Sequence, residues 1–237
     1  MVKRYGCAGI LLFAMGLFPL LAQDNAAAKE MAIKIADRIV ASTVYEFKDV
    51  KTGKVYTSLD NVSLNPDMRV NSKYLNWHYT NGVTNMALME LGDKIQNRKY
   101  EDYVLKNMKF IFDKTNQSYF HRLYDKTFRE GGWRAVPRLT WHMIYRNKRL
   151  DDNGPMGASL ITLNQRHPDD AFQKYIETTN HHIMVSEPRL ADGTIARLWL
   201  MKIQFGQMMR LWRCLLFPAW ERLLVKRSIL MMLPIRY

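Results

Sequence analysis

The stretch TNGVTNMALMELGDKI, Thr80 to Ile95, decides the fold class of this chain. Its apolar side chains recur at the three- to four-residue spacing of one helix face; they are Val83, Met86, Ala87, Met89 and Leu91. The same period occurs before this stretch, over residues 26–44, in Met31, Ile35, Ile39 and Val40. It occurs again after it, over Tyr100 to Phe112, in Tyr103, Val104, Met108 and Ile111. These repeated amphipathic segments predict a mainly helical protein.

Three shorter stretches are also predicted to be helices: Pro137 to Arg146, Pro155 to Leu163 and Asp169 to Met184. Proline suits a first helical turn, where its missing N–H would have no partner within the helix. Strand signals are few and cover Val55 to Leu59 and Thr194 to Leu198. Helices joined by polar loops with aromatic residues predict an all-α assembly of helical hairpins.

Composition excludes several classes of protein. The chain has 237 residues, of which 48% are hydrophobic and 24% are charged, so it is neither wholly disordered nor collagen-like. Two cysteines, Cys7 and Cys214, cannot build a disulfide framework or a cysteine-rich zinc site. The sequence contains no Gly-rich phosphate loop, no serine nucleophile elbow and no zinc-binding helix motif.

The formal net charge of +13 is concentrated at the two ends of the chain. Residues 1–22 contribute Lys3 and Arg4, and residues 200–237 contribute seven Lys or Arg against the single acid Glu221, which leaves +5 for residues 23–199. The body is therefore only mildly basic, and each end needs its own explanation.

Residues 1–22 are predicted to be an export signal. Lys3 and Arg4 precede an almost wholly apolar run from Cys7 to Leu21, and Ala22 then precedes a polar segment. The apolar run is shorter than the roughly 20 residues of a membrane span, and an uncleaved anchor is the alternative. We expect a periplasmic or secreted protein with no membrane contact once the signal is cleaved.

Trp77, His78 and Tyr79 precede the helix predicted from Thr80. Three rings with polar tips suit a sugar, whose C–H face stacks on rings and whose hydroxyls need hydrogen bonds. The alternative is structural: an apolar staple and a polar cap at the start of the helix. The aromatic residues between Tyr119 and Trp141 are likewise compatible with a pocket rim and with core packing.

Asp151 and Asp152 precede a Gly-Pro turn in the segment DDNGPMG, Asp151 to Gly157. Two carboxylates at the start of a helix cap its N–H groups or act on a ligand, and capping explains one acid more easily than both. His181 and His182 are adjacent, so their side chains do not converge on one metal ion. No metal site is expected.

Three segments in this order resemble a known enzyme family: LNWHYTNG from Leu75 to Gly82, RLDDNGPMGASL from Arg149 to Leu160, and RLADGTIAR from Arg189 to Arg197. They are similar to the unsaturated rhamnogalacturonyl hydrolases of glycoside hydrolase families 88 and 105, over about residues 28–199. The resemblance implies an (α/α)6 barrel of helical hairpins. It also implies removal of a Δ4,5-unsaturated uronic acid from pectin (rhamnogalacturonan) oligosaccharides, without a metal or organic cofactor.

The chemistry implied by this resemblance differs from direct displacement by two carboxylates at the anomeric carbon. An aspartic acid protonates the enol-ether double bond, water adds at C5, and the hemiketal collapses to release the sugar. Carried over to this sequence, the resemblance makes Asp152 the first of two important aspartates, which holds the substrate and helps to place the water or proton. The neighbouring Asp151 is a further substrate-binding residue. Trp77 and His78 correspond to the wall of the sugar pocket, and Arg197 lies near a substrate contact.

The second aspartate, the general acid, belongs to a Trp-Ala-Asp-Asp-like motif that this chain lacks after residue 199. Residues 200–237 hold eight Leu, five Met and seven basic residues. Methionine has a single codon, so the twin methionines Met208-Met209 and Met231-Met232 each encode an Asp when read one base earlier. In that frame, codon degeneracy allows the segment from Met201 to Met209 to encode Glu-Asn-Ser-Val-Trp-Ala-Asp-Asp. It likewise allows the segment from Leu223 to Met232 to encode Thr-Gly-Glu-Thr-Lys-Tyr-Phe-Asp-Asp. We infer a one-base loss near codons 198–201.

The sequence therefore predicts three segments: a signal peptide over 1–22, the N-terminal part of a hydrolase domain over 23–199, and an out-of-frame tail over 200–237. We expect an incomplete barrel of roughly half the helical hairpins, without hydrolase activity because the general acid is lost. The expected partner is an unsaturated uronyl oligosaccharide, with no nucleic acid. The alternatives are a non-catalytic sugar-binding remnant, or a basic tail that binds anionic surfaces.

Overall fold

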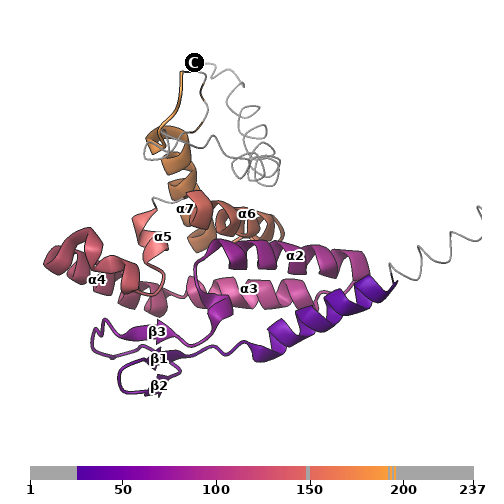
Figure 1. Ribbon diagram of the computed structural model, residues 1–237, viewed down its shortest axis with the longest axis horizontal. Helices are drawn as coiled ribbons and strands as arrows, with labels where there is room; N and C mark the ends of the chain where they lie inside the picture. The colour runs from indigo at the N-terminus through magenta and orange to yellow at the C-terminus, as the bar shows by residue number, and fades with distance from the viewer. Residues whose placement is uncertain (1–25, 148–149, 192, 194, 196–237) are drawn as a thin grey trace, which may run out of the picture. The chain divides into compact units, whose positions relative to one another are not determined.

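The computed structural model describes residues 26–147, 150–191, 193 and 195 (Figure 1). The predicted export signal, Arg197 and the tail 200–237 lie outside these described residues. The chain divides into two units, Met1–Ser42 and Thr43–Tyr237. The described residues of the first unit form a helix over residues 26–42, which confirms the helix predicted over 26–44.

The second unit begins with a small antiparallel sheet of three strands, β1 (Phe47–Asp49), β2 (Val55–Tyr56) and β3 (Met68–Val70), in the order β2-β1-β3. Phe47 lies opposite Tyr56 on one side and Val70 on the other. Its buried ring packs against Phe110 at 5.1 Å and Phe120 at 5.5 Å. Only β2 was predicted from the sequence, because β1 and β3 are too short for an alternating pattern to stand out.

The helices follow as hairpins (Figure 1). Their bounds are α2 (Tyr79–Ile95), α3 (Lys99–Ile111), α4 (Lys114–Gly131), α5 (His142–Arg146), α6 (Leu150–Arg166) and α7 (Asp170–His181). Short 3-10 turns cover Lys73–Leu75, Gly132–Arg134 and Val136–Arg138, and a π-helical turn covers His182–Ser186. Helix α2 packs on α3, α6 packs on α7, and α2 and α6 pack most extensively on each other. The predicted all-α architecture of helical hairpins is confirmed.

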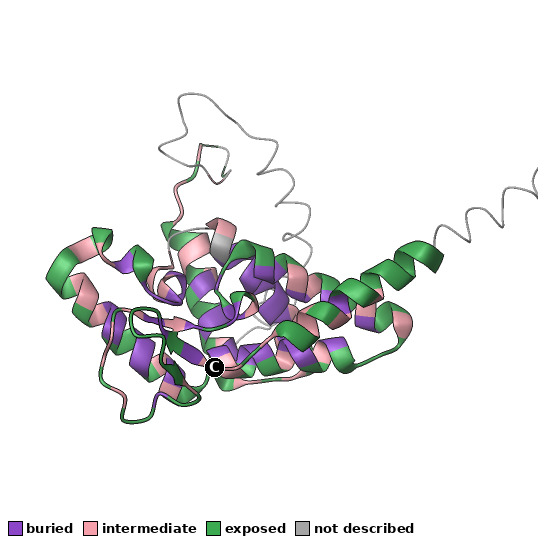
Figure 2. Cartoon of the chain, turned by 60° about the horizontal axis from the view of Figure 1, so that its bottom comes forward, coloured by how far each residue is buried: buried purple, intermediate pink, exposed green. Residues whose placement is uncertain are grey.

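Helix α3 shows why these hairpins form. Its buried side chains recur at helical spacing and are Tyr100, Tyr103, Val104, Asn107, Met108 and Ile111, so one stripe faces the interior and the other faces solvent (Figure 2). At the turn into α4, the Asp113 carboxylate accepts a hydrogen bond from the backbone N–H of Asn116 at 3.0 Å. Asp113 is thereby the N-cap of α4, which begins at Lys114, three residues after the last residue of α3.

Helix α4 was not predicted. Its charged surface surrounds a narrow buried stripe of Tyr119, Phe120, Leu123 and Tyr124, so the aromatic residues stand out more than the helical period. The structure resolves the two alternatives left open for this segment. Tyr119, Phe120 and Trp141 are core residues, whereas Trp133 is 43% exposed.

Three predicted helix boundaries are wrong. The helix expected over Pro137 to Arg146 is a 3-10 turn and a short α5, because Trp141 between them has a left-handed backbone with φ of 56°. Helix α6 begins at Leu150, so Pro155 lies inside it rather than in its first turn. Helix α7 ends at His181, and a π-helical turn follows.

Candidate functional site

Helices α2 and α6 bring the first two sequence segments of interest together. The indole Nε1–H of Trp77 donates a hydrogen bond to Asn153 Oδ1 at 3.2 Å, just before α2 and at the start of α6. At the other ends of both helices, Arg166 is 2.7 Å from Asp93. The two helices therefore run in the same direction, and both N-terminal ends lie at one site.

Gly82 makes this close packing possible. A Cβ atom on Gly82 would lie 2.4 Å from the backbone nitrogen of Met156 and 2.4 Å from the carbonyl carbon of Pro155. No side chain fits at that distance, so α2 and α6 touch backbone to backbone. Pro155 lies at the place where α6 meets Gly82.

Asn153 is the centre of a buried polar network at these N-terminal ends. The residue is 2% exposed. Its Oδ1 accepts hydrogen bonds from Trp77 and from the hydroxyl of Tyr175 at 3.2 Å, and its Nδ2 donates to Asn147 Oδ1 at 2.7 Å. One amide thereby fixes the start of α6 to the segment before α2, to α7 and to the end of α5. Sequence reasoning did not single out Asn153, although a polar residue inside an otherwise apolar helix face is a detectable signal.

Trp77 is buried in the core next to this network. It is 4% exposed, and its ring makes edge contacts with Tyr175 at 4.9 Å and with Phe112 at 5.7 Å. An apolar staple would require a side chain four residues into α2, but that residue is Gly82. Trp77 instead supports the start of α6 through Asn153, and its contact with sugar stays a prediction.

His78 is the N-cap of α2. Its Nδ1 accepts a hydrogen bond from the Thr80 backbone N–H at 3.4 Å and lies 2.9 Å from Thr80 Oγ1. The imidazole is exposed and lies against the ring of Tyr79, with centroids 4.4 Å apart. The capping interpretation is therefore confirmed, and His78 and Tyr79 supply the exposed rings at this end of α2.

Asp151 and Asp152 both lie in the first turn of α6, because that helix begins at Leu150. Negative charge in a first turn is stabilised by the helix dipole and its unpaired N–H groups. Asp152 directly precedes Asn153, so the backbone that carries it is held by the buried network. Arg197, the remaining predicted site residue, lies outside the described residues.

The C-terminal ends of α2 and α6 are electrostatically different. Arg166 bonds to Asp93 and Glu101, and His167 Nε2 lies 2.7 Å from Glu101 Oε1. Burial opposes ionisation of Glu101, but the hydrogen bonds from His167 and Arg166 outweigh it and hold the pKa of that carboxyl below its ordinary value. The hydrogen bond from Arg166 likewise lowers the pKa of Asp93.

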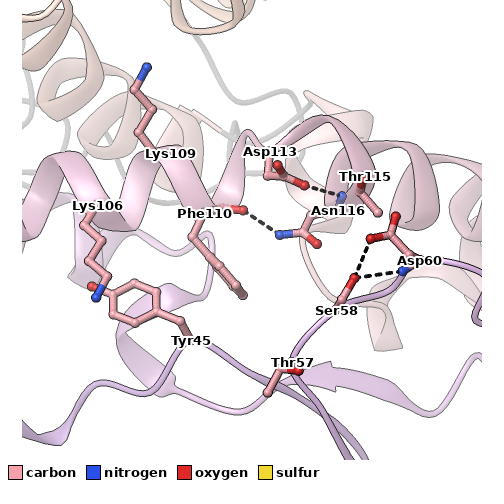
Figure 3. A pocket seen from close by; sticks show the side chains of 10 residues that line it. All are labelled: Tyr45, Thr57, Ser58, Asp60, Lys106, Lys109, Phe110, Asp113, Thr115 and Asn116. Atoms are coloured by element: carbon pink, nitrogen blue, oxygen red, sulfur yellow. Dashed lines mark hydrogen bonds between the residues drawn. The ribbon is translucent and has the colours of Figure 1, made fainter.

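A cavity of about 480 Å³ lies elsewhere, between the loop after β2 and the junction of α3 with α4 (Figure 3). The Lys106 ammonium lies 4.1 Å from the centroid of the Tyr45 ring, and Ser58 bonds to Asp60 at 2.8 Å. None of the predicted site residues lines this cavity. Because many of its polar groups bond to one another, we place the candidate site at the N-terminal ends of α2 and α6.

Among the described residues, no group of three or more His, Cys, Asp or Glu is arranged to hold a metal ion. His182 pairs with Glu187 at 3.1 Å. The same part of the chain contains no helix that is long and apolar enough to cross a membrane.

Two parallel helices from different hairpins therefore meet at their N-terminal ends, where α2 carries the exposed rings of His78 and Tyr79. Comparison with protein families gives a match to Glycosyl Hydrolase Family 88 over residues 29–217. The match covers most of the chain, and the chain belongs to this family. A search of curated proteins gives no match. The matched range continues past residue 199, where the sequence predicts a change of reading frame.

Proposed function

We propose that the site at the N-terminal ends of α2 and α6 belongs to a hydrolase that removes a Δ4,5-unsaturated uronic acid from pectin (rhamnogalacturonan) oligosaccharides. The observation that carries the proposal is the Trp77–Asn153 hydrogen bond, which joins the two sequence segments that resemble such enzymes. It brings the first turn of α6, which carries Asp151 and Asp152 in the sequence, to the N-terminal end of α2. Membership of Glycosyl Hydrolase Family 88 supports a carbohydrate as the substrate.

In this proposal Asp152, with Asp151 beside it, holds the sugar and helps to place the attacking water or the proton. His78 and Tyr79 provide rings against which a sugar packs. The buried network around Asn153 fixes the backbone of the first turn of α6, and catalysis by positioned groups requires such a fixed backbone. Arg197 is an additional substrate contact in this proposal.

The proton donor is proposed to be the aspartate of the Trp-Ala-Asp-Asp string that appears when residues 201–209 are read one base earlier. Without it, this chain is expected to bind the unsaturated uronide but not to turn it over, because a missing general acid costs roughly 10²–10⁴ in rate for that role alone. Export through the signal at residues 1–22 remains part of the same proposal.

The first test is to sequence the coding DNA across codons 190–237 from the source genome. An extra base near codon 200 is expected. A chain translated from the corrected frame should convert the unsaturated uronyl group to a released 4-deoxy-5-keto uronate, seen as loss of absorbance of the conjugated double bond. A confirmed sequence, together with turnover by the chain as it stands, would overturn the reading-frame proposal. Since the family match extends to residue 217, this test also decides whether residues 200–217 are native.

The second test separates binding from chemistry. Calorimetry with unsaturated digalacturonate should give saturable binding to the full chain, and Asp152→Asn should weaken it. Asp170→Asn is the matched control, because Asp170 lies in the first turn of α7. Equal effects of the two substitutions would contradict the proposed role of Asp152.

A further inference from the structure

The excess positive charge of the body is concentrated in one segment. Residues 122–149 hold eight Lys or Arg and two acids, a net charge of +6, whereas the rest of residues 23–199 holds 18 Lys or Arg and 19 acids. This basic segment runs from the middle of α4 through α5 to the residue before α6. It therefore ends immediately before the acid pair at Asp151 and Asp152, where an anionic ligand needs compensating charge.

Arg146 and Trp133 form a pair within this segment. The guanidinium carbon of Arg146 lies 5.2 Å from the centroid of the Trp133 indole, which is cation–π geometry. Trp133 is 43% exposed and also makes an edge contact with Phe128 at 4.6 Å. A large aromatic side chain that is nearly half exposed and oriented by a guanidinium is a common feature of binding sites.

The guanidinium of Arg146 is only partly satisfied by the fold. Its Nε–H is buried and has no hydrogen-bond partner among the described residues. Burial raises the pKa of the nearby Tyr124 hydroxyl, so this neighbour stays neutral and supplies no counter-charge. A buried donor without a partner is unfavourable, so the fold by itself does not account for this guanidinium.

The pair is connected to the candidate site by one hydrogen bond. Asn147, the residue after Arg146, accepts the bond from Asn153, the residue after Asp152. Helix α5, which ends at Arg146, contacts both α4 and α6 (Figure 1). Arg146 and Asp152 are thus each one residue away from the same 2.7 Å contact.

We propose that Arg146 and Trp133 form a subsite for the acidic sugar of the substrate, in which the guanidinium binds the carboxylate and the indole packs on the sugar ring. The inference rests on the function proposed above and specifies which residues recognise the uronate. The planar fork of an arginine matches the two oxygens of a carboxylate. An exposed indole provides the apolar surface that a sugar ring requires.

The test is calorimetric binding of two probes to the full chain: unsaturated digalacturonate as the free acid, and its neutral methyl ester. The wild-type chain should bind the free acid more tightly. Arg146→Gln should weaken binding of the acid about tenfold or more and leave the ester within twofold, so that the preference disappears. Trp133→Leu should weaken both probes, because the ring packs on the sugar and not on its charge.

Arg122→Gln is the matched control. It removes one positive charge from the same segment, and Arg122 bonds to the Ser118 carbonyl within α4. At 0.15 M salt it should change the affinity for the acid less than twofold. Thermal unfolding of each variant establishes that it is folded. If Arg146→Gln is not folded, Arg146→Lys takes its place. Lysine keeps the positive charge without the planar fork of the guanidinium, so it should lower the preference for the free acid in part.

The outcomes separate the two proposals. An unchanged preference for the acid in the folded Arg146 variants overturns the subsite and leaves the proposed function in place. A wild-type chain that binds neither probe overturns both. Equal losses in the Arg146 and Arg122 variants also overturn the subsite, since general charge would then explain the affinity.

Discussion

The two ends of the α2–α6 pair are held together by different forces. At the N-terminal ends, an uncharged network of one indole, one phenol and two amides is buried around Asn153. At the C-terminal ends, Asp93, Glu101, Arg166 and His167 form a charged cluster that is partly exposed. Buried amide hydrogen bonds fix geometry independently of pH and salt, whereas exposed ion pairs contribute little and respond to both. The end that carries the candidate site is therefore the rigid one.

The largest expected effect comes from Gly82→Val. The new side chain would meet backbone atoms of Pro155 and Met156 at distances that no Cβ contact adopts, and backbone cannot rotate away. We expect a loss of about 3 kcal/mol or more in the free energy of unfolding, measured by urea denaturation. Ala87→Ser, on the exposed face of the same helix, should change stability by less than about 0.5 kcal/mol. A stable Gly82→Val chain would show that the N-terminal ends are not rigid.

Asn153→Ala tests the network itself. It would remove the three hydrogen bonds that Asn153 makes with Trp77, Tyr175 and Asn147, so we expect a loss of about 2–4 kcal/mol. A double-mutant cycle with Trp77→Phe should give a coupling of about 1 kcal/mol. The control is Asn71→Ala, an exposed amide bonded to Glu46 at 3.3 Å, which should be nearly neutral. Additive effects of the Asn153 and Trp77 substitutions would contradict the network.

Acid pH should affect the opposite end. Folding lowers the pKa values of Asp93 and Glu101. The stability that these carboxylates contribute is therefore fully present at a pH above their pKa values in the unfolded chain. It is lost as the pH falls through their pKa values in the folded chain. Unfolding free energy should therefore decrease below about pH 4.5, and Arg166→Met should remove about 1 kcal/mol of that dependence. The destabilisation by Asn153→Ala should stay constant between pH 4.5 and 8, since its partners carry no charge in that range. A pH-dependent effect of Asn153→Ala would remove the contrast between the ends.

The smallest expected effect separates two roles of His78. His78→Ala should cost about 1 kcal/mol because the cap on Thr80 is lost. His78→Asn keeps a capping oxygen and removes the imidazole ring, so thermal stability should stay close to that of the wild-type chain. If binding of the unsaturated digalacturonate nevertheless weakens in His78→Asn, the ring contacts the sugar. Unchanged binding would limit His78 to its structural role.

The sequence by itself determined the helical elements whose apolar side chains recur with a clear period. The helices predicted over Thr80–Ile95 and Tyr100–Phe112 agree with α2 and α3 to within one residue at each end. It also determined the segments from which the site is built, because adjacent carboxylates and clustered rings are visible in the chain itself. Helix α4 and the strands β1 and β3 were missed, since short or weakly periodic stretches are selected by packing rather than by local preference.

Only the tertiary structure decided which residues meet. Asn153 bonds to Trp77, which is 76 positions away, and Gly82 touches Pro155 across a similar separation. No local pattern encodes such contacts, because they depend on the direction and spacing of two packed helices. The same packing placed Trp77 in the core and left Trp133 exposed, although both are single tryptophans in polar surroundings of the sequence. In α2, Val83 and Ala87 of the predicted apolar face are exposed, whereas Asn85 is buried. Hydrophobic periodicity therefore predicts that a segment is helical, and the fit between helices fixes which face is buried and which polar groups have to find partners.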